Sequence, residues 1–274
     1  MMPEYEIPAM QIRKLREMHV PNERDDEVRR HLYRLFQVDK DGKITSEPCR
    51  YAVGKETRGV VVIEPAGGGK TTAIRSVLKE AEFLGRNPDT GLSRYLEIQV
   101  PSPATNKSVG LAILEATGMT GVTERAKVWE IWKTVAHRLG LLDIKVLWLD
   151  EAHDLVLARS ASETETTLRL LKTLMQGDHA VIPILSGTQR LAELTSFDPQ
   201  VSRRFTKIVP PDLQHGYDDE NLHGLIAAYC GQVNIQPRVP EDLTARLITA
   251  SRFRFGRAIE TTVNAIECAL EAQS

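Results

Sequence analysis

Short apolar runs alternate with amphipathic segments through the middle of the chain. Runs rich in Val, Ile and Leu predict five strands, at residues 60–63, 95–100, 146–149, 180–186 and 205–209. Segments with the apolar spacing of a helix accompany them, at residues 71–84, 106–117, 123–139, 163–175 and 189–195. Because strands that alternate with crossover helices form parallel sheets covered on both faces, we expect a three-layer α/β fold.

The pattern changes on both sides of this region. After Pro210 and Pro211 it predicts helices only, at residues 218–230, 240–250 and 256–271. Before residue 56 the chain is charged and interrupted by prolines, with one helical pattern at residues 26–36. We therefore predict an N-terminal helical extension (1–55), an α/β domain (56–212) and a small C-terminal helical domain (213–274).

One acidic segment of the extension resembles a calcium loop. It contains Asp39, Asp41 and Gly42, but placing Gly42 at loop position six puts Gln37 and Pro48 where Asp and Glu are needed. An Asp-Gly pair between short extended runs is typical of a hairpin turn, and we interpret this segment as one.

Composition narrows the function without naming it. The chain has 274 residues, of which 42% are hydrophobic, and a formal net charge of −2. A near-neutral chain has no overall basic field, so any nucleic-acid binding must use a local patch or a ring of subunits. The three cysteines (Cys49, Cys230 and Cys268) are far apart, which is typical of reduced thiols in an intracellular protein. Without an apolar signal core or a membrane-length apolar run, we expect a soluble, cytoplasmic protein.

The glycine-rich segment after the first predicted strand carries candidate chemistry. It matches the phosphate-binding pattern G-x-x-x-x-G-K-[ST] except at its first position, where Glu64 replaces glycine. In such a loop, backbone N–H groups and a helix N-terminus face the phosphates, the lysine adds positive charge, and the first hydroxyl can hold Mg²⁺. We expect Glu64 to point away, because its carboxylate would repel phosphate. The predicted nucleotide-binding residues are Pro65, Ala66, Gly67, Gly68, Gly69, Lys70, Thr71 and Thr72.

A later predicted strand ends in two carboxylates, Asp150 and Glu151. In nucleotide-hydrolysing sheets the first acid orders Mg²⁺, and the next orients and deprotonates the attacking water. Each motif has a simpler alternative, which is a glycine-rich turn for the first and a helix start for the second. Their occurrence together, in this order along alternating strands and helices, predicts binding of ATP with Mg²⁺.

Three further positions suit an ATPase site. Thr188, or otherwise Ser186, follows the strand that we expect beside the Asp150 strand, where a hydroxyl can bind the attacking water or the γ-phosphate. A hydroxyl that caps the next helix is the alternative. Arg203 and Arg204 precede the last strand, from which an arginine can reach a neighbouring subunit's site as a finger, although adjacent surface arginines are often only solvated. Arg257 opens the last helix and can cover the phosphates, or form a local salt bridge instead.

In this order the motifs resemble those of the AAA+ ATPases. The likeness runs from about residue 55 to the end, and it implies an α/β P-loop domain with a C-terminal helical lid. Within that class the chain looks most similar to the TniB/TnsC transposition regulators. The features shared are Leu-Asp-Glu-Ala-His at 149–153, Leu-Ser-Gly-Thr-Gln-Arg-Leu at 185–191, and a charged helix led by Val-Pro-Asn-Glu-Arg at 20–24. Glu64 is the main departure, and it puts tight binding or fast hydrolysis in doubt.

The resemblance implies an ATP-dependent regulator of DNA transposition. Such proteins oligomerise as rings or filaments on double-stranded DNA without sequence preference, select a target with an adaptor protein and recruit a transposase. The basic residues expected to face the bore are Lys107, Arg125 and Lys127, each of which can also be an ordinary surface charge. The alternative is an AAA+ signalling or protein-remodelling switch that binds no DNA. A P-loop kinase is a further alternative, against which the Gly256-Arg257 lid argues.

Overall fold

The computed structural model describes residues 6–51, 56–121, 125–155, 161–193 and 202–272. The chain divides into two compact units. The first, here the sheet unit, comprises Glu23–Glu64 and Lys70–Pro210; the second, the helical unit, comprises Met1–Asn22, Pro65–Gly69 and Pro211–Ser274. The predicted extension is thus divided between the units, and the predicted domain boundaries stay predictions. Within the described residues, no helix combines the length and apolar character needed to cross a membrane.

The sheet unit is built on one parallel sheet. Its strands lie in the order β4-β5-β6-β3-β7, so β3, which comes first along the chain among these five, lies between β6 and β7. The Asp150 strand pairs with the strand that precedes Thr188, as predicted. This arrangement confirms the α/β fold predicted from the alternating pattern. The strands are β3 (Gly59–Ile63), β4 (Tyr95–Gln99), β5 (Val146–Asp150), β6 (Ile182–Gly187) and β7 (Phe205–Ile208).

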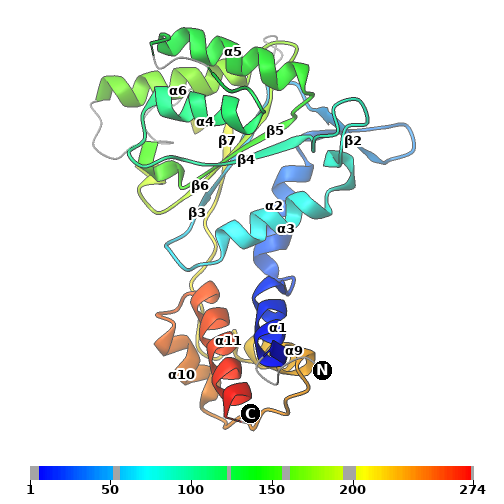
Figure 1. Cartoon of the computed structure of the whole chain (residues 1–274), viewed down its shortest axis with the longest axis vertical. Helices are drawn as coiled ribbons and strands as arrows, with labels where there is room; N and C mark the ends of the chain where they lie inside the picture. The colour runs from blue at the N-terminus through cyan, green and yellow to red at the C-terminus, as the bar shows by residue number, and fades with distance from the viewer. Residues whose placement is uncertain (1–5, 52–55, 122–124, 156–160, 194–201, 273–274) are drawn as a thin grey trace. The chain divides into compact units, whose positions relative to one another are not determined.

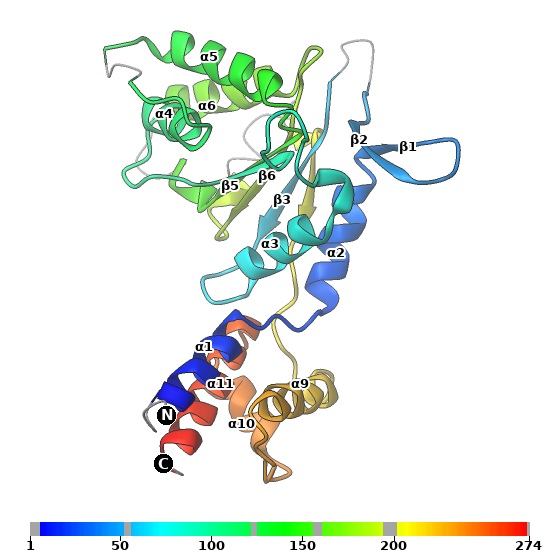
Figure 2. The same cartoon turned by 45° about the vertical axis from the view of Figure 1, so that its right-hand side comes forward.

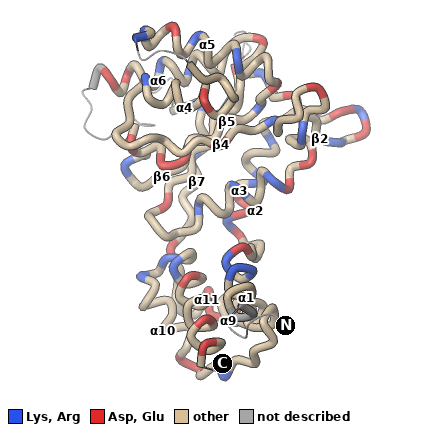
Figure 3. The backbone as a smooth tube through the Cα atoms, viewed as in Figure 1, with Lys and Arg blue, Asp and Glu red and all other residues tan. Residues whose placement is uncertain are grey.

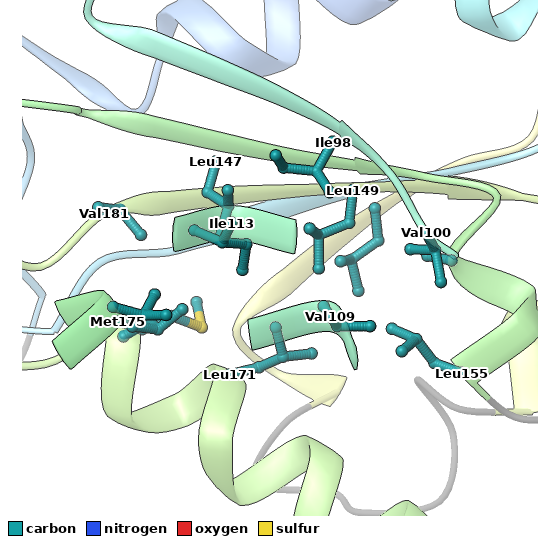
Figure 4. Close-up of a cluster of buried hydrophobic side chains, with 14 of the residues drawn as sticks. Ile98, Val100, Val109, Ile113, Leu147, Leu149, Leu155, Leu171, Met175 and Val181 are labelled. Carbon is teal, nitrogen blue, oxygen red and sulfur yellow. The ribbon is translucent and has the colours of Figure 1, made fainter. Parts of the chain in front are cut away.

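Alternate residues of the strands are buried in two separate hydrophobic cores, one on each face of the sheet. Val61 and Ile63 pack on the side of α4 (Asn106–Ala116), α5 (Val128–Leu141) and α6 (Ala161–Leu174). Figure 4 shows part of this core, with Leu147 and Leu149 of β5 above the helices. Val60 and Val62 pack on the side of α2 (Glu23–Tyr33) and α3 (Lys70–Glu80). The sheet is therefore the middle of three layers (Figure 1, Figure 2).

Helices α4 and α5 run in the same direction, side by side. Trp132 Nε1, in the second turn of α5, donates to the carbonyl of Asn106 at the start of α4 (2.7 Å). At the other end, an Arg138 N–H donates to the carbonyl of Thr117 (2.9 Å). Gly110 permits this approach, because a Cβ there would lie 2.6 Å from an Ile131 methyl. The two helices therefore begin at the same end of the sheet unit.

A two-stranded hairpin is also part of the sheet unit. Strand β1 (Phe36–Val38) pairs antiparallel with β2 (Ile44–Pro48). The Asp39 carboxylate accepts hydrogen bonds from the backbone N–H groups of Asp41 and Lys43, at 2.9 Å each. Gly42 takes a positive φ of 80°, which suits glycine in a tight turn. The acidic side chain thus stabilises the turn itself.

The helical unit contains four helices in its described part. The predicted C-terminal helices are present as α9 (Asp219–Gln232), α10 (Leu243–Ala250) and α11 (Phe255–Glu271). The fourth, α1 (Glu6–Glu17), was not predicted. Its Ile12 and Leu15 are buried among the apolar residues of α9, α10 and α11. Arg16 also pairs with Glu267 of α11 at 2.8 Å.

Other predicted bounds differ at their ends. Helix α3 stops at Glu80 and is followed by a separate 3₁₀ turn, Glu82–Leu84. Helix α5 begins at Val128 instead of residue 123. The predicted helix at 189–195 lies partly outside the described residues, as do residues 122–124. A 3₁₀ turn, Ala152–Leu155, follows the Asp150 strand directly.

Candidate nucleotide-binding site

The two motif strands bring their polar residues together within the sheet unit. Lys70 and Thr71 open α3, and Asp150 and Glu151 follow from β5. Thr71 Oγ1 donates to Asp150 Oδ2 at 2.8 Å, and Lys70 Nζ lies 3.3 Å from Glu151 Oε1. Lys70 is buried, with 6% of its side chain exposed. Residues that lie 79 and 81 positions apart along the chain thus form one polar cluster at the carboxyl ends of the strands.

Asp150 is held from several sides. Its Oδ1 accepts hydrogen bonds from Ser186 Oγ at 2.6 Å and from the Glu151 backbone N–H at 2.9 Å. Ser186 in turn accepts a hydrogen bond from Trp148 Nε1 at 2.7 Å, and both side chains are fully buried. Ser186, the second choice for contact with the nucleotide, therefore orients Asp150. Sequence reasoning missed this relay, because β5 and β6 had to be in register for it to form.

Glu151 has an unusual backbone. Its φ is +55°, in the left-handed region that residues with a Cβ adopt at a cost. The 3₁₀ turn Ala152–Leu155 starts immediately afterwards, so the chain reverses sharply at the end of the strand. This conformation turns the Glu151 carboxylate towards Lys70 on one side and His153 on the other, where Oε2 lies 3.2 Å from Nδ1.

His153 connects Glu151 to the end of β6. Its Nδ1 lies 3.5 Å from the Thr188 backbone nitrogen, which donates to it, and 3.2 Å from Glu151 Oε2. Gly187 makes room for the imidazole, because a Cβ there would lie 3.1 Å from Nδ1. The sequence places His153 two residues after Glu151, but we assigned it no role. Thr188 itself is half-buried at the predicted position beside β5.

Glu64, at the first position of the glycine-rich motif, is buried. Its backbone N–H donates to the Gly187 carbonyl at 3.0 Å, which continues the pairing of β3 with β6. Its side chain is buried, and Oε1 accepts a hydrogen bond from Arg24 Nε at 3.0 Å. Burial raises the pKa of the Glu64 carboxyl, while the charges of Arg24 and Lys70 oppose that shift. The partner Arg24, in the first turn of α2, was also missed by sequence reasoning.

The glycine-rich loop residues 65–69 belong to the helical unit. The backbone N–H groups of Gly256 and Arg257, at the start of α11, donate to the carbonyls of Gly68 and Gly67 at 3.0 and 2.9 Å. A Cβ on Gly256 would lie 2.7 Å from the Gly67 oxygen, and one on Gly67 would lie 2.8 Å from Arg257 Cγ. The loop carbonyls are therefore bound by the first turn of α11, and the Arg257 side chain lies against Gly67.

The two candidate finger arginines have different surroundings. Arg204 is buried and forms an ion pair with Glu56, its Nε donating to Oε2 at 2.9 Å. Arg203 is exposed. Only Arg203 therefore presents its side chain to solvent at this position.

The three predicted DNA-contacting residues come from the beginnings of α4 and α5. Lys107 is in the first turn of α4, and Lys127 directly precedes α5. Arg125 lies two residues before Lys127, and both are exposed. Because α4 and α5 begin at the same end of the sheet unit, these three cations lie near the N-termini of both helices. Elsewhere acidic and basic residues are interspersed along both units (Figure 3).

The sheet order, the cluster of Lys70, Thr71, Asp150 and Glu151, and the C-terminal helices define a P-loop ATPase of the AAA+ class. A family model described as bacterial TniB protein matches residues 16–215. The chain therefore belongs to the TniB family, which confirms the family resemblance seen in the sequence. No curated protein matches the chain.

Solved structures share the fold at low sequence identity. The Aeropyrum pernix ORC1 protein, solved in complex with DNA, is 18% identical with a TM-score of 0.61 over 93% of this chain and 62% of that chain. The ORC2 protein of the same organism, solved as ADPNP-ADP complexes, is 17% identical with a TM-score of 0.60 over 93% and 63%. Cdc6p of Pyrobaculum aerophilum is 14% identical with a TM-score of 0.53 over 78% and 55%. The chain thus spans about three fifths of the two Aeropyrum proteins, and these similarities bear on the fold alone.

Proposed function

We propose that this protein binds and hydrolyses ATP and uses that cycle to regulate DNA transposition. The observation that carries the ATPase part is the meeting of the two motifs, with Thr71 Oγ1 2.8 Å from Asp150 Oδ2 and Lys70 Nζ 3.3 Å from Glu151 Oε1. A glycine-rich turn without function would not need a buried lysine beside a carboxylate. The ADPNP-ADP complexes of the structurally similar ORC2 protein also support a nucleotide in this fold.

The residues present fit Mg²⁺. Thr71 and Asp150 offer a hydroxyl and a carboxylate oxygen side by side, and Mg²⁺ prefers oxygen ligands and is commonly held by one or two carboxylates together with substrate phosphates. The described residues contain no group of three or more His, Cys, Asp or Glu side chains that could hold a metal without a substrate. Bound there, the ion would neutralise charge on the phosphates during transfer.

Each remaining residue of the site has a role that its position allows. Lys70 supplies positive charge to the β- and γ-phosphates, and the N–H groups of the glycine-rich loop and the first turn of α3 bind their oxygens. Glu151 accepts the proton of the attacking water, because its half-exposed carboxylate directly follows Asp150 at the end of β5. Thr188 contacts the water or the γ-phosphate from the end of β6. Within the helical unit Arg257 lies against Gly67, and its proposed role is to cover phosphates bound at the glycine-rich loop.

Negative charge develops on the transferred phosphoryl group in the transition state, and an arginine from outside the site can stabilise it. We assign the proposed arginine-finger role to Arg203, because Arg204 already forms an ion pair with Glu56. Supply of this residue by a neighbouring subunit makes the ATPase an oligomer. Mixing an Arg203→Ala chain with a Lys70→Ala chain then restores part of the turnover, because one interface of each mixed pair is complete. No recovery in a mixture shown to co-assemble would rule out a shared site.

The DNA part of the proposal rests on the cations at the starts of α4 and α5 and on the TniB family itself. Helix N-termini with adjacent Lys and Arg bind phosphates, which carry no sequence information. The proposed ligand is therefore double-stranded DNA bound without sequence preference, and the ORC1 protein of this fold was solved with DNA. Recruitment of a transposase and of a target-selection adaptor completes the proposed role.

The test is retention on duplex DNA with a non-hydrolysable ATP analogue, observed by electron microscopy and by salt titration. We expect assemblies that need both ligands, and a steep loss of binding with added salt because phosphate contacts release counterions. Replacing Lys107, Arg125 and Lys127 by Ala should remove retention without changing nucleotide binding. The matched control replaces Lys40, Lys43 and Lys79, which are exposed elsewhere in the sheet unit. If the wild-type protein with nucleotide ignores DNA, the protein-remodelling switch replaces the transposition role.

A further inference from the structure

Glu64 occupies the position where the phosphate-binding pattern has glycine, and the structure shows how its negative charge is accommodated. The backbone N–H of Glu64 is hydrogen-bonded to the Gly187 carbonyl, and its side chain is held by Arg24. The side chain is only 4% exposed, and its Oε2 makes no hydrogen bond to any described residue. A buried carboxylate therefore stands directly before the glycine-rich loop, which we propose binds phosphate.

Arg24 is the residue that compensates this charge. Its Nε lies 3.0 Å from Glu64 Oε1, and only 12% of its side chain is exposed. Arg29, on the same helix, pairs with Asp26 and Glu80 in a far more solvated setting, where 76% and 48% of the partner side chains are exposed. Water weakens the Arg29 pairs strongly and the Arg24 pair little, because a charge interaction grows as the local dielectric falls.

The charge on Glu64 also reaches Lys70. Burial raises the pKa of Glu64, and the ammonium of Lys70 is one of the two charges that lower it again. This coupling is reciprocal: an ionised Glu64 without Arg24 would reduce the attraction of Lys70 for phosphate. With Arg24 in place, the pair is neutral and the positive charge of Lys70 is available.

We propose that Arg24 is a positioning residue of the nucleotide site, which cancels the charge of Glu64 so that phosphates can bind beside it. The inference rests on the proposed ATPase function. It makes nucleotide binding depend on Arg24, a requirement that the usual glycine at position 64 would not create. Arg24 has further interactions of its own, and the proposal concerns only its pairing with Glu64.

The test measures dissociation constants for AMP, ADP and a non-hydrolysable ATP analogue by titration, with thermal stability recorded for every variant. Arg24→Ala should weaken the ATP analogue about tenfold, ADP less and AMP least, because an uncompensated carboxylate repels a ligand in proportion to its charge. Arg24→Lys keeps the charge and should remain close to the wild type. Arg24→Ala combined with Glu64→Gly should bind within about twofold of Glu64→Gly alone, because nothing is left to compensate.

The pH dependence gives a second readout. Without Arg24, one of the two charges that lower the Glu64 pKa is lost, so the carboxyl takes up a proton at a higher pH than in the wild type. The defect of Arg24→Ala should therefore be largest at high pH and shrink as the pH falls through that raised pKa. In the Arg24→Ala, Glu64→Gln protein the defect should be absent at every pH.

Three results would overturn the inference. One is an equal loss of affinity for AMP and for the ATP analogue in Arg24→Ala, which would indicate that Arg24 has only a structural role. Another is a double variant as weak as Arg24→Ala, which indicates that Arg24 itself binds the nucleotide. The third is an equal loss in the control Arg29→Ala, or in Arg24→Lys. A wild-type protein that binds none of the three nucleotides would instead refute the proposed function, and the inference with it.

Discussion

Ser186 Oγ donates to Asp150 Oδ1 at 2.6 Å while it accepts a hydrogen bond from Trp148 Nε1 at 2.7 Å. Ser186 on β6 therefore links two side chains of β5, the buried indole of Trp148 and the carboxylate of Asp150, which we propose as an Mg²⁺ ligand. Metal ligands oriented by a neighbouring hydrogen bond commonly lose affinity when that neighbour is removed. Ser186 is thus placed to act on the site through Asp150.

Ser186→Ala should weaken Mg²⁺ more than it weakens nucleotide. The change also leaves the Trp148 N–H buried without a partner, which costs about 1–3 kcal/mol of stability. The measurements are Mg²⁺ titration of ATP hydrolysis, nucleotide titration and denaturant unfolding. Thr173→Ala is the control, because its hydroxyl donates to the Arg169 carbonyl on an exposed helix face away from the site. An unchanged Mg²⁺ requirement in Ser186→Ala would show that Asp150 needs no such support.

Gly187 should be required for turnover through His153. A Cβ at Gly187 would lie 3.1 Å from both the His153 backbone nitrogen and Nδ1, so Gly187→Ala requires a small shift of the histidine that contacts Glu151. We expect Gly187→Ala to lower kcat by less than His153→Ala does, with KM changed little, and His153→Asn to recover part of kcat. The comparison is steady-state hydrolysis at several ATP concentrations.

A matched glycine–histidine pair serves as the control. A Cβ at Gly140 would lie 2.7 Å from the His179 ring, away from the two motifs. Gly140→Ala should therefore lower stability without the kcat effect. Equal kcat losses in the two glycine variants would contradict a specific role for His153.

Glu151 should show opposite effects on stability and turnover. Its φ of +55° is costly for any residue with a Cβ, whereas glycine adopts it freely. Glu151→Gly should therefore be more stable than Glu151→Ala by about 1 kcal/mol, although both stop hydrolysis. Glu151→Gln keeps the side-chain length and should bind ATP without turnover. Unfolding curves of the three variants test the strain, and wild-type hydrolysis by Glu151→Gln would exclude the glutamate as the base.

The sequence was sufficient for the features that depend on local pattern. The five strands follow from runs such as Val60–Ile63, whose alternate residues serve the two cores, and the site motifs follow each strand directly. Helix α1 was missed because its pattern contains Pro8, which a helix tolerates in its first turn, and because Ile12 and Leu15 gain their burial only from α9 to α11.

Pairs between distant positions could not be predicted. Arg24 and Glu64 are 40 positions apart, and Arg204 and Glu56 are 148 apart. Nothing in the local sequence indicates which of many charges meet, since that depends on the helix and strand packing. The same holds for His153, whose contact with the end of β6 requires the register of β5 and β6.

The ion pair of the buried Arg204 with the half-buried Glu56 should make stability depend on pH in the acid range. The hydrogen bond from Arg204 lowers the pKa of Glu56 below its ordinary value of 4.5. A carboxyl with a lowered pKa stabilises the fold above its unfolded-state pKa, and this stabilisation is lost as the pH falls through the lowered value. Glu56→Gln should therefore be less stable than the wild type at pH 7 by about 1.5–3 kcal/mol, because a neutral amide makes a weaker hydrogen bond to the Arg204 guanidinium than the carboxylate does. The difference should shrink steadily below pH 4.5. Denaturant unfolding from pH 7 downwards measures this, with Glu165→Gln as the control, because Glu165 pairs with Arg169 on an exposed face. A wild-type and variant difference that stays constant with pH would show that the pair does not depend on the charge of Glu56.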